Sequence, residues 1–188
     1  MPRRALISRD AVLDATLALA DERGLGAVSM RTVSSRLGVT PMALYHHVRD
    51  KDDLLDGLVE RLLAELQPPD PSLPWKERLR TLADGIRATA ARHADAFLLL
   101  LRRPVGTAAA LDVREAVYTA LRDAGVTEAL VPRVERLLST FVIGFAASEA
   151  GGRFAAHEKA VRDADFEWAW QQILLVVEAE RSQIGAGR

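Results

Sequence analysis

The chain has 188 residues, of which 49% are hydrophobic and none is cysteine, and its formal net charge is −1. This composition allows a sizeable apolar core, excludes disulfide bonds and thiolate metal sites, and is compatible with a reducing cytoplasm. Residues 1–51 hold 8 Lys and Arg against 5 Asp and Glu, whereas the remainder holds 17 against 21. A basic first segment favours a small nucleic-acid-binding unit attached to a larger body.

Membrane segments are not expected anywhere in the chain. The longest relevant uncharged run, residues 137–148, has 12 residues, and a membrane span needs roughly 18 or more. Near the N-terminus, Arg9, Asp10 and Asp14 interrupt any apolar run that could act as a signal peptide. We therefore predict a cytoplasmic protein that does not interact with membranes.

Apolar residues recur with helical spacing in nearly every long segment, and strand signals are almost absent, which predicts an all-α fold. Ser8 can cap a first helix that runs to about Arg23, and Gly24 ends it. The next helices are expected at residues 30–37, 41–48 and 51–66, with Asp50 as the cap of the last one.

The junction between residues 30–37 and 41–48 has the pattern of a tight turn between two helices. Gly38 stands where a helix ends with positive φ, Thr40 can cap the next helix, and Pro41 suits its first turn. This is the layout of a helix-turn-helix, in which the second helix enters the major groove of DNA.

The helix at residues 41–48 has two different sides. At about 100° per residue, Leu44 and Val48 share the side that can pack on the preceding helix. The other side carries small or ring-bearing residues: Met42, Ala43 and His46, flanked by Tyr45 and His47. A solvated face would normally carry Lys, Glu and Gln, so this face suits base edges and phosphates. The alternative is that the two histidines are ordinary surface residues.

Residues 67–74, QPPDPSLP, hold four prolines in eight residues and mark a boundary. We expect a first domain at residues 1–51, a connecting helix at 51–66 and a second domain at 67–188; a kinked loop between neighbouring helices is the alternative. Helices of the second domain are expected at residues 75–93, 94–101, 108–124, 131–150 and 165–182. Residues 153–164 are expected to form a loop or a weak helix.

The last helix is apolar on both sides. Phe166 and Trp170 lie on one side and Trp168 and Leu175 on the other, so a second surface must cover the latter pair. The preceding helix offers small residues for close approach: Gly144, Ala147, Ser148 and Gly151. We predict a two-fold symmetric four-helix dimer interface. The alternative is that Trp168 covers the edge of the core under residues 153–164.

Candidate residues for a largely apolar ligand pocket come from the middle helices: His93, Phe97, Leu98, Leu101, Tyr118, Leu121, Leu138, Phe141 and Phe145. Ordinary core packing is the alternative for each of them. His93 and Tyr118 need polar partners if they are buried, and His93 could also be a solvent-exposed residue at a helix end.

Catalytic and metal-binding patterns are absent from the sequence. The four histidines are His46, His47, His93 and His157, and none has the spacing of a metal ligand set. The sequence contains no glycine-rich phosphate loop, GxSxG elbow or cysteine nucleophile. We expect no enzyme, no metal and no cofactor.

Residues 9–58 resemble the DNA-binding domain of the tetracycline-repressor (TetR) family of bacterial transcription regulators from end to end. The most specific part is LGVTPMALYHHV followed by DKDDLL. Beyond Leu66 only the helical layout is similar. The resemblance implies DNA contacts at ten residues: Met30, Arg31, Thr40, Pro41, Met42, Ala43, Tyr45, His46, His47 and Lys51.

The implied roles of these residues differ. Met30 and Arg31 would touch phosphate or a base, residues 40–43 would face bases, and Lys51 would bind phosphate at a helix N-terminus. Tyr45 and His47 would contact the DNA backbone, and His46 would contact bases or phosphate.

The resemblance also implies a homodimer that binds a palindromic double-stranded operator and a small, largely apolar inducer in the second domain. The expected function is a ligand-responsive transcriptional regulator that acts as a repressor and releases DNA when the inducer binds. An architectural DNA-binding protein without an inducer is the alternative.

Overall fold

The computed structural model describes residues 7–103 and 107–182, and all regular structure within these residues is helical, which confirms the all-α prediction. The elements, with η for 3₁₀-helices, are α1 (Arg9–Arg23), η1 (Leu25–Ala27), α2 (Met30–Arg36), α3 (Pro41–Leu44), α4 (Lys51–Ala64), α5 (Trp75–Arg92), α6 (Ala94–Phe97), η2 (Leu98–Leu101), α7 (Ala108–Asp123), α8 (Val131–Ala150) and α9 (Lys159–Ser182).

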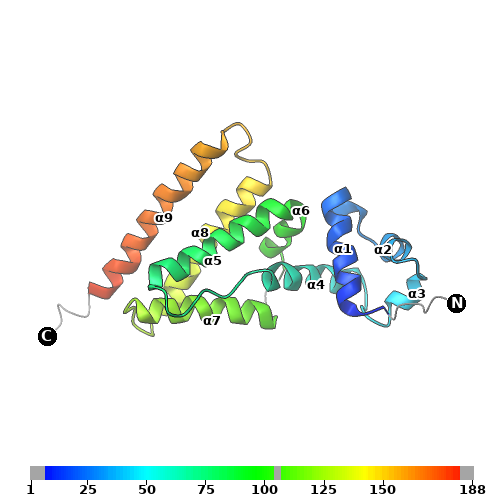
Figure 1. Ribbon diagram of the computed structural model, residues 1–188, viewed down its shortest axis with the longest axis horizontal. Coiled ribbons are helices and arrows are strands. Elements are labelled where there is room, and N and C mark those ends of the chain that lie inside the picture. Colours follow the sequence, from blue (N-terminus) through cyan, green and yellow to red (C-terminus); the bar gives the residue numbers. More distant parts are fainter. Residues whose placement is uncertain (1–6, 104–106, 183–188) are drawn as a thin grey trace.

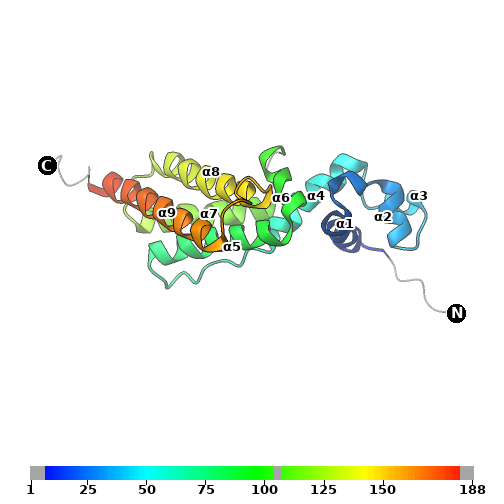
Figure 2. The same cartoon turned by 90° about the horizontal axis from the view of Figure 1, so that it is seen from above.

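The molecule is elongated, with α1 to α3 at one end and α5 to α9 at the other (Figures 1 and 2). We call α1 to α3 the head and α5 to α9, with η2, the body. α4 connects the two (Figure 1). None of the described helices combines the length and apolar character that a bilayer span requires.

Local hydrogen bonds place the starts of α1 and α4 where the sequence predicts them. The Ala11 N–H donates to Ser8 Oγ at 3.1 Å, and the Asp53 N–H donates to Asp50 Oδ1 at 2.8 Å. Gly24 ends α1 with φ +78°, a conformation that favours glycine. These bonds satisfy backbone donors that a helix end leaves free.

Three predicted helices differ in extent from the observed ones. The helix expected at 41–48 ends at Leu44, because the His47 N–H turns back to the Leu44 carbonyl three residues earlier, at 2.8 Å. Thr40 precedes this helix in extended conformation, but its side chain makes no capping bond. Residues 98–101 form a 3₁₀-helix rather than an α-helix.

The third difference is at the last helix, which begins at Lys159 rather than at residue 165. Its first turns are held by ion pairs that the local pattern does not reveal: Lys159 with Asp163, and Asp163 with Arg87 of α5 at 2.9 Å. Half of the segment expected as a loop or a weak helix, residues 153–164, is therefore part of this helix.

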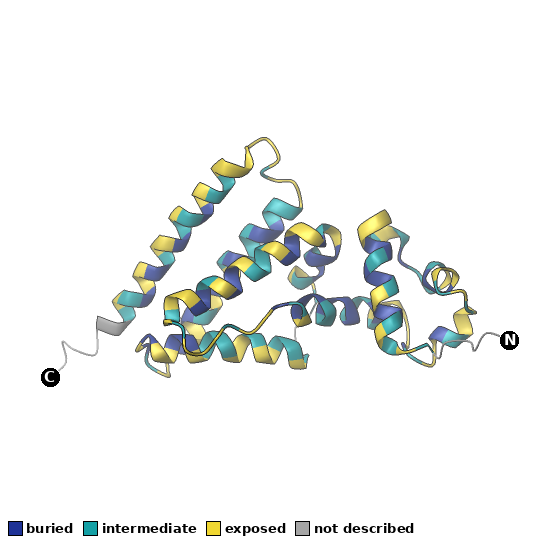
Figure 3. Cartoon of the chain, in the orientation of Figure 1, coloured by how far each residue is buried: buried dark blue, intermediate teal, exposed yellow. Residues whose placement is uncertain are grey.

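One buried cluster joins α1 to α4 and extends to Ala96 and Leu99 beside the body. Gly57 allows α1 to approach α4 closely, because a Cβ at this position would collide with the Leu13 side chain. A second cluster joins α5, α7, α8 and α9, and Phe166 is fully buried within it. Buried and exposed residues alternate along α9 (Figure 3).

Candidate nucleic-acid interface and cavity

Reciprocal bonds fix the start of α2, and a glycine shapes the turn between α2 and α3. Ser29 Oγ accepts from the Thr32 N–H at 3.1 Å, and Thr32 Oγ1 accepts from the Ser29 N–H at 2.9 Å, which is a capping box. Gly38 has φ +67° and lets the chain turn after α2. The two short helices are thereby held at an angle to each other.

The inner side of α3 is buried and its outer side is open. Val33, Leu44 and Val48 are buried in the first cluster. On the outer side, Met42 is 70% exposed and Tyr45 50% exposed, and Thr40, Pro41 and His46 are also exposed. An exposed methionine and tyrosine beside a histidine form a surface able to touch bases by apolar contact and phosphates by hydrogen bonds.

The remaining residues expected at DNA occupy different environments. Arg31 and Lys51 are exposed and form no ion pair with any described residue. Ala43 and His47 are half-buried. Met30 is partly buried and packs against the first cluster, so its side chain serves the core of the head.

A polar network holds the end of this segment to α1 and α4. Arg9 Nη1 donates to the His47 carbonyl at 3.1 Å, and Arg9 Nη2 donates to Asp53 Oδ1 at 3.0 Å. The Arg49 N–H donates to Asp53 Oδ2 at 2.8 Å. Burial raises the pKa of the Asp53 carboxyl, but the Arg49 N–H and the Arg9 guanidinium outweigh it and hold that pKa below its ordinary value.

We predict that Asp53→Asn lowers the free energy of unfolding at pH 7 by about 1–3 kcal/mol, because Asp53 accepts hydrogen bonds as a half-buried carboxylate. A lowered pKa in the folded state means that the unfolded state binds more protons, so this stabilisation is present above the ordinary Asp pKa and is lost as pH falls through the folded value. The difference between wild type and variant should therefore shrink as pH falls from about 5 to 3.

Urea unfolding followed by circular dichroism across that pH range measures the difference. Asp112→Asn, an exposed carboxylate in α7 without a hydrogen bond or ion pair to any described residue, is the matched control. A pH-independent loss in Asp53→Asn would contradict the role of its charge.

The body contains a cavity of about 400 Å³ between α4, α5, α7 and α8. Its wall is mainly aliphatic and includes Leu63 of α4, Leu100 of η2 and Trp170 of α9. Polar groups from α7 and α8 complete it: Arg114, Glu135, Arg136 and Ser139. This volume and lining fit a small, largely apolar molecule.

The sequence-based pocket residues are mostly elsewhere, because the pattern does not reveal how the helices rotate. Of the nine, Leu138 alone lines this cavity. The other eight do not line this cavity. Phe141 and Phe145 instead face Phe166 of α9, with ring centroids 5.5 and 5.1 Å apart.

The other predicted pocket residues have separate roles. Phe97 lines a small hollow of about 20 Å³, and Leu101 is exposed. Tyr118 lies under the guanidinium of Arg122, which is 5.6 Å from its ring centroid. Leu98 packs against a third cluster, formed by Ala90, Phe97, Ala146 and Ala147, and Leu121 is buried in the second cluster.

His93 lies at the junction of head and body rather than in the cavity or at a solvent-exposed helix end. Its Nδ1 is 2.8 Å from Asp21 Oδ2 of α1, and its Nε2 is 3.1 Å from Glu65 Oε1 at the end of α4. The ring is buried, and each of its two nitrogens has a carboxylate as its partner. This residue ties α1, α4 and the start of α6 together.

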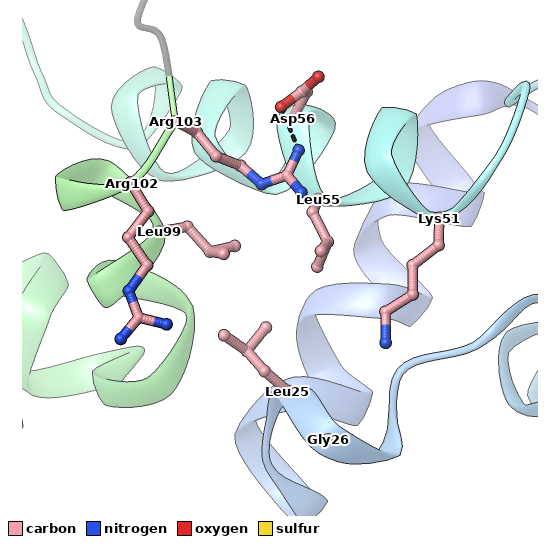
Figure 4. Close-up of a pocket in the computed structure, with 8 residues that line it drawn as sticks. All are labelled: Leu25, Gly26, Lys51, Leu55, Asp56, Leu99, Arg102 and Arg103. Carbon is pink, nitrogen blue, oxygen red and sulfur yellow. Dashed lines mark hydrogen bonds and ion pairs between the residues drawn. The ribbon is translucent and has the colours of Figure 1, made fainter.

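A second polar contact, between the end of η2 and α4, lies at an open hollow between head and body (Figure 4). Arg103, just after η2, donates to Asp56 Oδ1 at 2.5 Å and to Asp52 Oδ1 at 2.6 Å on α4. Lys51 and Arg102 lie on opposite sides of the hollow, and leucines form its floor (Figure 4). The arginine therefore joins the end of η2 to the first turns of α4.

The outer face of α9 is apolar and open in the single chain. Trp168 is 69% exposed and Leu175 57% exposed, so Trp168 does not cover the core edge. On α8, Gly144 and Ser148 are half-buried and Gly151 is exposed. Ala147 is instead buried in the chain's own third cluster, a correction to its expected place on the dimer surface.

Within the described ranges, no three His, Cys, Asp or Glu side chains gather in a way that could hold a metal ion.

Comparisons with known proteins match both parts of the chain. The family profile described as "Bacterial regulatory proteins, tetR family" matches residues 12–58, and the one described as "Tetracyclin repressor-like, C-terminal domain" matches residues 67–175. An HTH-type transcriptional regulator of Saccharopolyspora erythraea is 32% identical over 87% of this chain and 73% of its own length.

Two further proteins are similar over most of this chain. The HTH-type transcriptional repressor DrrR1 of Streptomyces coeruleorubidus is 29% identical over 90% of this chain and 63% of its own length, so this chain is shorter than both curated relatives. The crystal structure of the TetR family protein ActR of Streptomyces coelicolor in complex with (S)-DNPA has a TM-score of 0.80 and 25% identity. The match spans 93% of this chain and 98% of the ActR chain.

Proposed function

Because the chain belongs to the tetR family of bacterial regulatory proteins, we propose that it is a repressor that binds a palindromic operator as a dimer. A small molecule in the body cavity would release it from DNA. The observation that carries this proposal is the open Met42 and Tyr45 side of α3, held outward by buried Leu44 and Val48. We propose that the protein has no catalytic activity. We also propose that it acts in the cytoplasm, as a repressor of bacterial genes does.

The proposed DNA surface comprises exposed or half-buried residues from the start of α2, from residues 40–47 and from the start of α4: Arg31, Thr40, Pro41, Met42, Ala43, Tyr45, His46, His47 and Lys51. Met30 supports this surface from the core of the head. The unpaired Arg31 and Lys51 supply positive charge for phosphates. We propose that residues 1–51 form the DNA-binding domain, joined by the connecting helix at 51–66 to a ligand-binding and dimerisation domain at 67–188.

A dimer through α8 and α9 fits the open face of α9. Trp168 and Leu175 would pack against the partner copy, with Gly144, Ser148 and Gly151 allowing close approach. Two-fold symmetry presents two recognition segments to one face of a duplex, with half-sites about 34 Å apart or a multiple of it, and a palindromic operator follows.

The cavity touches the elements that position the head. Leu63 belongs to α4, and Leu100 belongs to η2, whose end is joined to the first turns of α4 by Arg103. A ligand that favours another position of α4 would change the spacing of the two heads in the dimer. DNA release requires that the ligand bind the non-DNA-binding arrangement more tightly.

The test is a pull-down of bacterial genome fragments with the purified protein, followed by ligand screening for thermal stabilisation and DNA release. We expect one palindromic promoter fragment to bind far more tightly than bulk DNA. A purely architectural protein would show little sequence preference and strong salt dependence throughout. The cavity would have no role in such a protein, so we favour the repressor.

We predict that Tyr45→Ala lowers the affinity for operator and non-operator DNA alike by about tenfold, because loss of a contact to the DNA backbone is independent of base sequence. Fluorescence anisotropy with both duplexes measures the change. Met42→Ala should instead alter the preference among operator variants, because its side chain faces bases. Unchanged affinity in Tyr45→Ala would mean that α3 is not the recognition helix.

A further inference from the structure

The polar groups of the body cavity are all on one side. Thirteen of the seventeen lining residues are apolar and come mainly from α5, α7 and α8. The four polar residues belong to α7 and α8: Arg114, Glu135, Arg136 and Ser139. A molecule that fills this cavity would have its apolar part against α5 and its polar end between α7 and α8.

The charge at this polar side is positive. Arg114 and Arg136 form no ion pair with any residue that the structure describes, and Glu135 is the single carboxylate beside them in the cavity wall. Most arginines elsewhere in the body pair with carboxylates: Arg78, Arg80, Arg87 and Arg122. Two guanidinium groups at the rim therefore retain free donors.

These donors select a particular ligand chemistry. A guanidinium group binds a carboxylate through two parallel hydrogen bonds, and such charge-assisted bonds are stronger than neutral ones. Both guanidinium groups are exposed at the rim, and the adjoining wall of the cavity is aliphatic. A neutral or cationic ligand would leave both guanidinium groups without this partner.

We propose that the cavity takes an amphipathic anion, a molecule with an apolar or aromatic body and one carboxylate held by Arg114 and Arg136. This inference rests on the proposed function for its regulatory consequence, but the preference for an anion is a property of the cavity itself. Ser139 lies beside the same rim, and its hydroxyl donates to the Arg136 carbonyl at 3.3 Å, so its proton is engaged within α8 and the anion would be held by the two guanidinium groups.

The experiment compares ligands that differ only in the polar group. Isothermal titration calorimetry on the full chain without DNA uses two carboxylate and amide pairs, decanoate with decanamide and 2-naphthoate with 2-naphthamide. We expect the carboxylate to bind at least about tenfold more tightly in one pair or both, the scale of a hydrogen bond to a charged group. No carboxylate preference in either pair overturns the proposal.

Three variants test the assignment to these residues. Arg114→Gln and Arg136→Gln should each remove most of the carboxylate preference. Arg133→Gln is the matched control, because Arg133 is an exposed arginine of α8 without an ion pair and lies outside the cavity wall; it should retain the preference. Tighter binding of an amine with the same skeleton than of the carboxylate would mean that Glu135, not the two arginines, sets the charge preference of the rim. This result would overturn the proposal.

Operator release is measured separately by fluorescence anisotropy. A carboxylate that binds with the expected preference but leaves the operator complex intact supports the ligand class and contradicts ligand-controlled release. A protein that releases its operator equally well with the amide contradicts the ligand class while the repressor function stands.

Discussion

Replacing Trp168 with glutamate is expected to convert the protein to a monomer and to lower its affinity for operator DNA by at least about a hundredfold. Trp168 is 69% exposed in the single chain, and together with Leu175 it forms the apolar outer face of α9. A charge at this position would be buried without a partner in the dimer. Once the dimer separates, each head binds a half-site alone and loses the high effective concentration of its linked partner, commonly worth 10²- to 10⁴-fold, or about a hundredfold at the low end.

Sedimentation velocity at micromolar concentration measures the first effect, with 20.6 kDa expected for the variant and twice that mass for the wild type. Fluorescence anisotropy with the operator duplex measures the second. Trp168→Phe keeps an apolar ring and should retain the dimer. A Trp168→Glu variant that sediments as a dimer would mean that α9 does not form the interface.

Phe166→Ala, two residues away on the opposite side of the same helix, is expected to destabilise the fold by about 3–5 kcal/mol, the usual cost of truncating a buried phenylalanine. Phe166 is 0% exposed and stacks on Phe141, with ring centroids 5.5 Å apart. The guanidinium of Arg87 lies 4.3 Å from its ring centroid. Truncation leaves a cavity where α5, α8 and α9 meet and removes the cation–π contact.

Chemical denaturation in the Trp168→Glu background measures this loss without a contribution from dimer dissociation. In thermal denaturation of the same variant, the melting temperature should fall by roughly 10 °C, since each kcal/mol of lost stability corresponds to about 2–4 °C in a chain of this size. The surface control is Trp168→Ala in the otherwise wild-type chain, measured at a concentration where this variant is monomeric. It should change the stability of the monomer by no more than about 0.5 kcal/mol. Equal losses at both positions would contradict the assignment of inner and outer faces.

The Trp168→Glu and Phe166→Ala variants separate two roles of α9, the dimer contact of its outer face and the core packing of its inner face. The inner face of α9 is anchored by the aromatic cluster and by ion pairs such as Arg80 with Glu167 at 2.5 Å. Trp168 and Leu175 on the outer face stay exposed among the described residues, so this face is available to a second copy. Loss of the inner face should also weaken the dimer, whereas loss of the outer face should leave the chain folded.

Helix positions and the turn before α3 were predictable because they depend on bonds between residues close in sequence. Ser8 and Asp50 cap the helices that follow them, and Gly38 adopts the positive φ that the turn needs. The outward side of α3 was also predictable, because the Val48 N–H bonds to the Leu44 carbonyl and so keeps the two residues on one side, although α3 itself ends at Leu44. The exposure of Trp168 follows from the same periodicity.

The cavity and the junction between head and body required the tertiary structure. The sequence predicted His93 as a candidate pocket residue but not its place at the junction, because its partner Asp21 is 72 residues away and meets it only when α1 packs beside α6. Helical periodicity places Phe141 and Phe145 in the interior but does not say whether they face α9 or the cavity. That choice depends on how the helices are rotated against one another, and the rotation is set by packing between residues distant in sequence.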